Sequence, residues 1–443
     1  MSRHDNIFFI PAGDLLGYGK DDFVIVYSPL AESYLLMSED EADNLRNAMA
    51  GNRPSDEYDA ILKELEDYTP IENRNDQIRS CRDFVTLYVL PNYACNFKCS
   101  YCFASEGRDK QRLDISKLLR MIDWMLDRER TSERKIHITF LGGGEPALSF
   151  DVIKPAVEYG NMRALRNGFE VVWNIVTNGS LVTDAMLDFF KEENVVVRYS
   201  FEILRDIQER QRGDYTAVHE SIVSACRKGM RPVIRSMITP INVDRIVEMV
   251  EIVAKEYPGV GILKFDPITD SSFGADLEKM EQFYKTYNDS FLKAKAKGEE
   301  YGIDVQCVVT RNLDSVISRF CAGEISLNAY GEITSCHRVS SPREAGYYDL
   351  RYGYVDNDGV HVDEQRFLEI TSDKVDTKTN CAGCFLKYNC AGGCHAQNEQ
   401  YTGDMQKIVC EYSRDLSRRE LLGRLDREIK RETGKGIRLQ IGK

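Results

Sequence analysis

Between residue 83 and about residue 266, short apolar segments alternate with helical ones, and this alternation limits the chain to a small set of folds. Six strand and helix units follow one another, beginning with FVTLYVL, ISKLLRMIDWML and KIHITFL. Apolar strands joined by crossover helices build a parallel sheet whose chemistry lies at the carboxyl ends of the strands. The sequence therefore predicts an α/β protein with an open parallel sheet or a partial barrel of six units.

The residues before this region follow another pattern. Residues 7–36 contain β-rich pieces separated by turn-forming residues, which predicts a small antiparallel sheet. Ser38, followed by Glu41, and then Ser55 predict the starts of two helices. We expect a small strand-then-helix domain over residues 1–80.

The region after the alternation is rich in cysteine and glycine from Cys321 to Cys410 and then becomes a charged helix. A segment with so many potential ligands needs bound metal to hold its fold. We expect the alternating core to span residues 81–300, the cysteine-rich domain 301–412 and the C-terminal helix 413–443.

Charge and hydropathy restrict the partners. The formal net charge is −13 in 443 residues, whereas proteins that bind nucleic acid present clustered Lys and Arg. The start of the chain has no basic segment followed by a long apolar run, and no stretch of about 18 apolar residues occurs. We expect a cytoplasmic protein that binds neither nucleic acid nor membrane.

Thirteen cysteines are many for a cytoplasmic protein, and an odd number cannot all pair into disulfides. Ten of them stand at close spacings, whereas Cys81, Cys226 and Cys307 stand alone. An isolated cysteine is usually a small buried hydrophobe. The ten clustered cysteines are therefore the candidate metal ligands.

The first cysteine cluster is Cys95, Cys99 and Cys102, which form a CxxxCxxC loop just after the first apolar strand of the core. Soft thiolates suit a [4Fe–4S] cluster, and three of them leave one iron open for a small ligand. Zinc is the alternative, although closed zinc sites use four ligands, usually in CxxC pairs. The spacing favours iron and sulfur over zinc.

This loop, with Tyr101 before its last cysteine, resembles the signature loop of the radical S-adenosylmethionine (SAM) superfamily. The glycine-rich end of the next strand resembles the GGEP motif of that family. The resemblance implies a partial (β/α)6 barrel of the TIM type, in which the methionine group of SAM chelates the open iron and Tyr101 lies near the adenine. It also implies that the methionine amino group is held by the motif residues Gly143, Gly144, Glu145 and Pro146.

Four further residues match the family more loosely: Thr177, Asn178, Ser200 and Arg235. They lie on or at the ends of the third, fourth and fifth strands, where the family contacts the ribose or the methionine carboxylate, and structural roles suit them equally well. Many relatives have Ser-Leu-Asp-Gly-Pro on the fourth strand, but this chain has Ser-Phe-Glu-Ile-Leu from Ser200. No catalytic acid or base is therefore assigned.

The later cysteines resemble the SPASM domain, which carries two auxiliary [4Fe–4S] clusters in enzymes that modify peptides and proteins. The resemblance implies one cluster on Cys381, Cys384, Cys390 and Cys410, and another on Cys321, Cys336 and Cys394. Three clusters would then be present in all. Two four-iron clusters need eight ligands and this array offers seven, so either one iron stays open or Cys307 closes it. A structural zinc module is the alternative for this segment.

The N-terminal domain resembles, in pattern only, peptide-recognition domains of the PqqD type, with a structural cap on the barrel as the alternative. Together the resemblances imply a radical SAM oxidoreductase that matures a ribosomally made (RiPP) precursor peptide, whose leader would add as a strand to the edge of that domain. The product would be a thioether crosslink, with a carbon–carbon crosslink or formylglycine formation in a sulfatase as alternatives. A flavodoxin or ferredoxin would supply electrons. Outside enzymes, the alternatives are an iron–sulfur electron carrier and a peptide-binding scaffold.

Overall fold

An eleven-stranded sheet dominates the computed structural model, which describes residues 3–52, 56–71, 74, 78–269, 276–398, 401 and 403–437. The strands lie in the order β10-β9-β8-β7-β6-β5-β4-β11-β12-β13-β14. All neighbours from β10 to β11 are parallel, whereas β11 to β14 pair antiparallel. The parallel strands are β4 (Thr86–Val89), β5 (Lys135–Phe140), β6 (Glu170–Thr177), β7 (Val196–Ser200), β8 (Val233–Ile238), β9 (Ile262–Pro267), β10 (Asp304–Gln306) and β11 (Ile325–Leu327).

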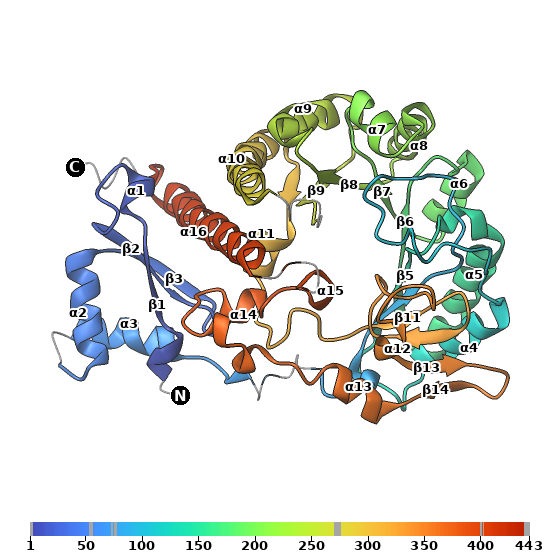
Figure 1. The fold of residues 1–443 in the computed structure, drawn as a ribbon, viewed down its shortest axis with the longest axis horizontal. Coiled ribbons are helices and arrows are strands. Elements are labelled where there is room, and N and C mark those ends of the chain that lie inside the picture. The colour runs from blue at the N-terminus through green and yellow to red at the C-terminus, as the bar shows by residue number, and fades with distance from the viewer. Residues whose placement is uncertain are drawn as a thin grey trace.

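Strands β4 to β9 are the six expected strands, and they curve into an open barrel with helices on its outer side (Figure 1). Sequence explains the first of these helices, because Asp114 accepts a hydrogen bond from the Ser116 N–H and Leu118, Ile122 and Met125 bury one face. The helices are α4 (Ile115–Met125), α5 (Phe150–Asn167), α6 (Asp184–Glu192), α7 (Arg205–Gln211), α8 (Tyr215–Arg227) and α9 (Ile246–Glu256). The partial (β/α)6 barrel is confirmed. In the described part of the chain no helix combines the length and apolarity needed to cross a membrane.

The cysteine-rich segment is built onto the barrel rather than forming a sheet of its own. Strand β11 pairs in parallel with β4, the strand that leads into the first cysteine loop. Strands β12 (Glu332–Thr334), β13 (Arg351–Val355) and β14 (Val360–Val362) then extend the same sheet. At the other edge β10 joins β9 beyond residue 300, so the barrel sheet continues past the boundary expected from the sequence. The segment also holds the short helices α11 (Val308–Asn312), α12 (Tyr347–Leu350), α13 (Glu364–Ile370), α14 (Lys387–Cys390) and α15 (His395–Asn398).

The N-terminal domain is the small antiparallel sheet that the sequence predicts. Its strands are β1 (Phe8–Pro11), β2 (Phe23–Ser28) and β3 (Ser33–Ser38), with β2 in the middle, followed by α2 (Glu39–Met49) and α3 (Asp56–Glu66). The capping box at α2 is confirmed, since the Glu41 carboxylate accepts the Ser38 N–H at 2.8 Å and the Ser38 hydroxyl accepts the Glu41 N–H. Ser55, expected to start the second helix, lies outside the described residues.

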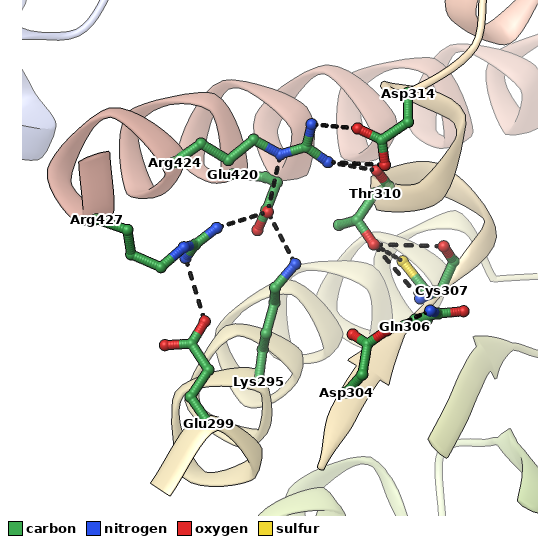
Figure 2. A network of polar contacts seen from close by, with 10 residues as sticks. All are labelled: Lys295, Glu299, Asp304, Gln306, Cys307, Thr310, Asp314, Glu420, Arg424 and Arg427. Carbon is green, nitrogen blue, oxygen red and sulfur yellow. Dashed lines mark hydrogen bonds and ion pairs between the residues drawn. The ribbon is translucent and has the colours of Figure 1, made fainter. Parts of the chain in front are cut away.

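Helix α16 (Asp404–Thr433) ties the three regions together, and it begins before the expected boundary at residue 413. It packs along α10 (Leu277–Tyr301), where the buried Glu420 accepts hydrogen bonds from Lys295 at 2.8 Å, Arg424 at 3.2 Å and Arg427 at 3.1 Å (Figure 2). On the N-terminal domain, Asp14 pairs with Arg418 of the same helix at 3.1 Å. Cys410 thus lies inside a helix that is anchored to both neighbouring domains.

Candidate active site

The three cysteines of the first loop lie together at the carboxyl end of β4 and line a large cavity. Burial raises the pKa of Cys99, and the thiols of Cys102 and Cys95 raise it further, because neighbouring thiolates repel one another. Arg212 opposes that rise, and Arg108 Nη2 donates to Cys102 Sγ at 3.4 Å. The Nε atoms of both arginines are buried without an acceptor among the described residues. Three thiols beside incompletely satisfied cations fit an anionic iron–sulfur cluster.

The glycine-rich end of β5 is held against the cysteine loop by backbone hydrogen bonds. The Gly144 N–H donates to Asn92 O at 3.0 Å, and the Glu145 N–H donates to Ala94 O at 2.8 Å. A Cβ on Gly144 would lie 2.0 Å from Ala94 O, and one on Gly143, whose φ is +64°, would lie 2.8 Å from Asn92 O. Only glycine allows this approach, so the fold joins the two motifs into one site.

The Glu145 carboxylate joins two further predicted residues to this site. Its oxygens accept the Thr177 hydroxyl at 2.5 Å and the Asn178 backbone N–H at 2.7 Å. Burial raises the pKa of Glu145, and these hydrogen bonds hold it down by stabilising the carboxylate. Asn178 Nδ2 lies 4.0 Å from Cys95 Sγ, and Pro146 begins a short 3-10 helix, Pro146–Ser149. The ends of β5 and β6 are therefore fixed to the cysteine loop by one buried network.

A buried polar group that the sequence did not assign follows β7. Glu202 is fully buried and accepts hydrogen bonds from the Tyr101 phenol and, at 2.7 Å, from the Ser236 hydroxyl. Arg212 donates to the Tyr101 oxygen at 3.0 Å, and its Nη1 lies 3.9 Å from Glu202 Oε1. The structure thus fixes the Tyr101 side chain on the cysteine loop to the wall of the barrel. The signal in the sequence is the position of Glu202, two residues after Ser200, where many relatives have aspartate.

Ser200 and Arg235 face the cavity from neighbouring strands, at one register position of β7 and β8. The half-exposed Arg235 guanidinium pairs with Asp266 on β9 at 3.0 Å, so it has a carboxylate partner within this chain. Two further cations that the sequence analysis missed, Arg198 and Lys264, line the same wall. Both could have been found from the sequence, because each is a charged residue inside an otherwise apolar strand.

Four of the later cysteines gather into one group. Burial raises the pKa of Cys390 to about 12, and the thiols of Cys410, Cys384 and Cys381 all add to that rise. The four therefore lie close enough to act on one another. The structure brings together the set that the SPASM resemblance implies for one cluster.

Cys321, Cys336 and Cys394 form another group. Burial raises the pKa of Cys321 to about 11, and the charges of Glu324 and Cys394 add to it. Burial raises the pKa of Cys336 to about 12, with Glu324 and Cys321 as further causes. Glu324 is itself engaged, because its carboxylate lies 2.8 Å from Nδ1 of His337 and accepts the His337 N–H at 2.9 Å.

All ten clustered cysteines line one cavity of about 1850 Å³, and Cys81, Cys226 and Cys307 do not. Cys307 is 3% exposed, and its sulfur lies 3.5 Å from the Thr310 hydroxyl, just behind the lining residues Val308 and Val309. In the described ranges, no three His, Cys, Asp or Glu side chains converge on a point that a single metal ion could occupy. A four-iron cluster is instead bound at separate iron atoms, for which spaced thiols are suitable ligands.

The barrel core matches a known family. The Radical SAM superfamily matches residues 89–273, which include the cysteine loop and the glycine-rich strand end. Residues 89–273 therefore carry a Radical SAM domain. Its fold is similar to anSMEcpe with bound AdoMet and Kp18Cys peptide, with a TM-score of 0.62 and 15% identity over 76% of this chain and 98% of that one. It is also similar to SuiB of Streptococcus suis bound to precursor peptide SuiA, with a TM-score of 0.51 and 12% identity over 90% of this chain and 96% of that one.

Two relatives in sequence cover most of this chain. The chain is 23% identical over 397 residues to the radical SAM cyclopropyl synthase TigE of Paramaledivibacter caminithermalis, covering 80% of this chain and 78% of TigE. It is 21% identical over 355 residues to the cysteine-type anaerobic sulfatase-maturating enzyme of Clostridium novyi, covering 72% of this chain and 90% of that enzyme.

Proposed function

We propose that the protein is a peptide maturase that removes a hydrogen atom from a ribosomally made precursor and thereby starts crosslink formation. The observation that carries this proposal is the single cavity onto which three groups of cysteines open. When bound, a [4Fe–4S] cluster and SAM supply the 5′-deoxyadenosyl radical that such chemistry needs. Cys95, Cys99 and Cys102 would hold that cluster, and the two later groups would hold auxiliary ones, giving three in all.

The chain's own residues prepare the site in three ways. Gly143 and Gly144 let the strand end approach the cysteine loop, and the buried Glu145 network keeps it there. Arg108 and Arg212 offset the negative charge of the thiolates. Glu202 and Arg212 fix the Tyr101 side chain of the cysteine loop to the wall of the barrel. Ser200 and Arg235 would contact the bound SAM.

A peptide is the substrate that the architecture and the comparisons favour. The cavity exceeds the roughly 300–1000 Å³ of common small-molecule sites, although clusters and SAM would fill part of it. Two similar structures carry peptides, Kp18Cys and SuiA. In the N-terminal domain, β3 lies at the edge of its sheet, and no strand of the described residues covers its outer side. A leader peptide would add there by backbone hydrogen bonds.

The bond formed in the product is the finer part of the proposal. Seven cysteines serve eight ligand positions, and Cys307, which is buried and does not line the cavity, would have to move to become the eighth. A position left for a ligand from outside the chain suits a cysteine-containing peptide and therefore a thioether product. Similarity to the cyclopropyl synthase TigE favours a carbon–carbon bond as the second candidate. In either case an external flavodoxin or ferredoxin would deliver the electrons.

Co-expression with a precursor peptide encoded beside this protein tests the proposal. Mass spectrometry should show a loss of two hydrogens from the peptide, and treatment with iodoacetamide should show whether a cysteine has become unreactive. A blocked cysteine indicates a thioether, whereas full alkylation indicates a carbon–carbon bond. The reconstituted protein with SAM and dithionite should also release 5′-deoxyadenosine. If no 5′-deoxyadenosine forms either with or without peptide, the proposal that the protein is an enzyme is refuted.

A further inference from the structure

The inner wall of the barrel carries a row of cations from four different elements. Arg198 lies on β7, Arg235 on β8, Lys264 on β9 and Arg311 on α11, and all of them line the cavity. Lys264 and Arg235 occupy the same register position of neighbouring strands, so their side chains leave the sheet on the same face. Asp266 is the carboxylate that pairs with this row, and it pairs with Arg235. Three of the four cations remain; we call Arg198, Lys264 and Arg311 the wall cations.

The wall cations repel one another, and Asp266, the carboxylate that acts on Lys264, is already paired with Arg235. Burial lowers the pKa of Lys264 to about 8, and the positive charges of Arg311 and Arg198 lower it further. Among the residues that the structure describes, neither the Lys264 nor the Arg311 side chain has a hydrogen bond or ion pair. Arg198 donates through Nε to the neutral Asn174 side chain at 3.0 Å. Holding like charges together in a half-buried place is unfavourable unless an anion joins them.

Other cations already accompany the cysteine groups. Arg212 and Arg108 act on the first group, as their effect on Cys99 shows. Arg319 acts on Cys321, and Lys378 and Lys387 act on the third group. The wall cations are therefore a further positive region of the cavity, beyond the charges beside each group of thiols.

The wall cations act on a residue of β4, several strands away in the sheet. Burial and the charge of Glu324 raise the pKa of Tyr88 on β4, and Cys321 adds to that rise. The positive charges of Arg311 and Arg198 lower this pKa, so they act on Tyr88. The Tyr88 ring also lies 5.2 Å from the His337 ring, beside Cys336. A group bound to the wall cations would thus lie on the side of the cavity that faces Tyr88 and the second group of cysteines.

The charge of the cavity contrasts with that of the whole chain. Twelve lysines and arginines but only five carboxylates line it, whereas the whole chain has 58 basic and 71 acidic residues. A part of the cavity that carries more basic than acidic side chains attracts negatively charged groups once they have entered it.

We propose that Arg198, Lys264 and Arg311 bind a carboxylate of the substrate, the side chain of an aspartate or glutamate close to the residue that is modified. This inference rests on the proposed function only in taking the substrate to be a peptide. Guanidinium groups match a carboxylate with paired donors, and the lysine adds a point charge. The three elements hold their donors apart, so the acidic side chain would be fixed in position as well as attracted.

Fluorescence anisotropy with two labelled pentapeptides tests the site. The holoenzyme with SAM is titrated at low ionic strength with Gly-Asp-Gly-Asp-Gly and with Gly-Asn-Gly-Asn-Gly, which differ in charge alone. The aspartate peptide should bind about tenfold more tightly. Lys264→Gln and Arg311→Gln should remove most of that difference while retaining full iron content, which shows that they are folded. Lys285→Gln, at an exposed position of α10, is the matched control and should keep the difference.

Equal affinity for the two peptides in the wild type would overturn the proposal. So would a preference that survives in Lys264→Gln and Arg311→Gln, or one that Lys285→Gln loses equally. The maturase proposal fails by a separate measurement, the absence of any mass change in the co-expressed precursor. Charge-selective binding and peptide modification can therefore be judged independently.

Discussion

Replacing Glu420 with glutamine should destabilise the seam between α16 and α10. The Glu420 side chain is 1% exposed and is the common acceptor for Lys295, Arg424 and Arg427 (Figure 2). Glutamine keeps the shape of the side chain but removes its charge. Arg424 would keep its pair with Asp314, whereas Lys295, only 17% exposed, would lose its carboxylate.

The expected cost follows from this partial compensation. Breaking a buried ion pair by removing one partner costs roughly 3–5 kcal/mol, because an uncompensated charge remains in the interior. Since the arginines retain other partners, we expect the lower end, about 3 kcal/mol. At about 2–4 °C for each kcal/mol in a large domain, the melting temperature should fall by roughly 6–12 °C.

Thermal unfolding of the anaerobically purified holoenzyme, followed by circular dichroism, measures this shift. Glu300→Gln is the control, because Glu300 forms an exposed pair with Lys297 on the same helix and its loss should cost less than about 0.5 kcal/mol. Cys410 lies on α16, so Glu420→Gln should also release iron sooner on heating. A melting temperature equal to that of the wild type, or a drop matched by Glu300→Gln, would show that the charges around Glu420 do not stabilise the contact between α16 and α10.

Three further outcomes are expected. Gly144→Ala would place a Cβ 2.0 Å from Ala94 O, so iron analysis should show about four of about twelve irons lost; full iron content would contradict the packing argument. Cys99→Ala should lose the same irons and all SAM cleavage, whereas Cys226→Ala, outside the cavity, should lose neither. Lys264→Met should be more stable than the wild type at pH 7, by about 1–2 kcal/mol after solvent screening. The pKa of Lys264 is lowered from 10.5 to about 8, so between these pH values the unfolded wild type binds more protons than the folded one, and the stability of the wild type rises with pH. Denaturant titrations should therefore show the advantage of the variant shrinking from pH 8 to pH 10.5. An advantage that is constant with pH would contradict this.

The parts of the fold that depend on local sequence could be predicted. Apolar runs gave the six barrel strands, and the spacing of Cys95, Cys99 and Cys102 gave a loop whose chemistry depends on a few neighbouring residues. The groups that require distant strands to meet could not be predicted. Arg212 reaches Tyr101 only because the end of α7 lies beside the cysteine loop, and the pairing of β11 with β4 joins segments more than 200 residues apart. The start of α16 was missed because its first turns contain Cys410, which was assigned to the cysteine-rich domain.

The parallel pairing of β11 with β4 also has a mechanical consequence. Both the first cysteine loop and the segment that leads to Cys336 grow from this one hydrogen-bonded ladder. Changing the separation of these two groups would require breaking backbone pairs in the middle of a sheet, which is costly. The first cysteine loop and the segment that leads to Cys336 are thus held at a fixed separation by one pair of hydrogen-bonded strands. Movements that admit a long peptide are left to the opposite side of the sheet, where helix α16 packs on α10 and α11.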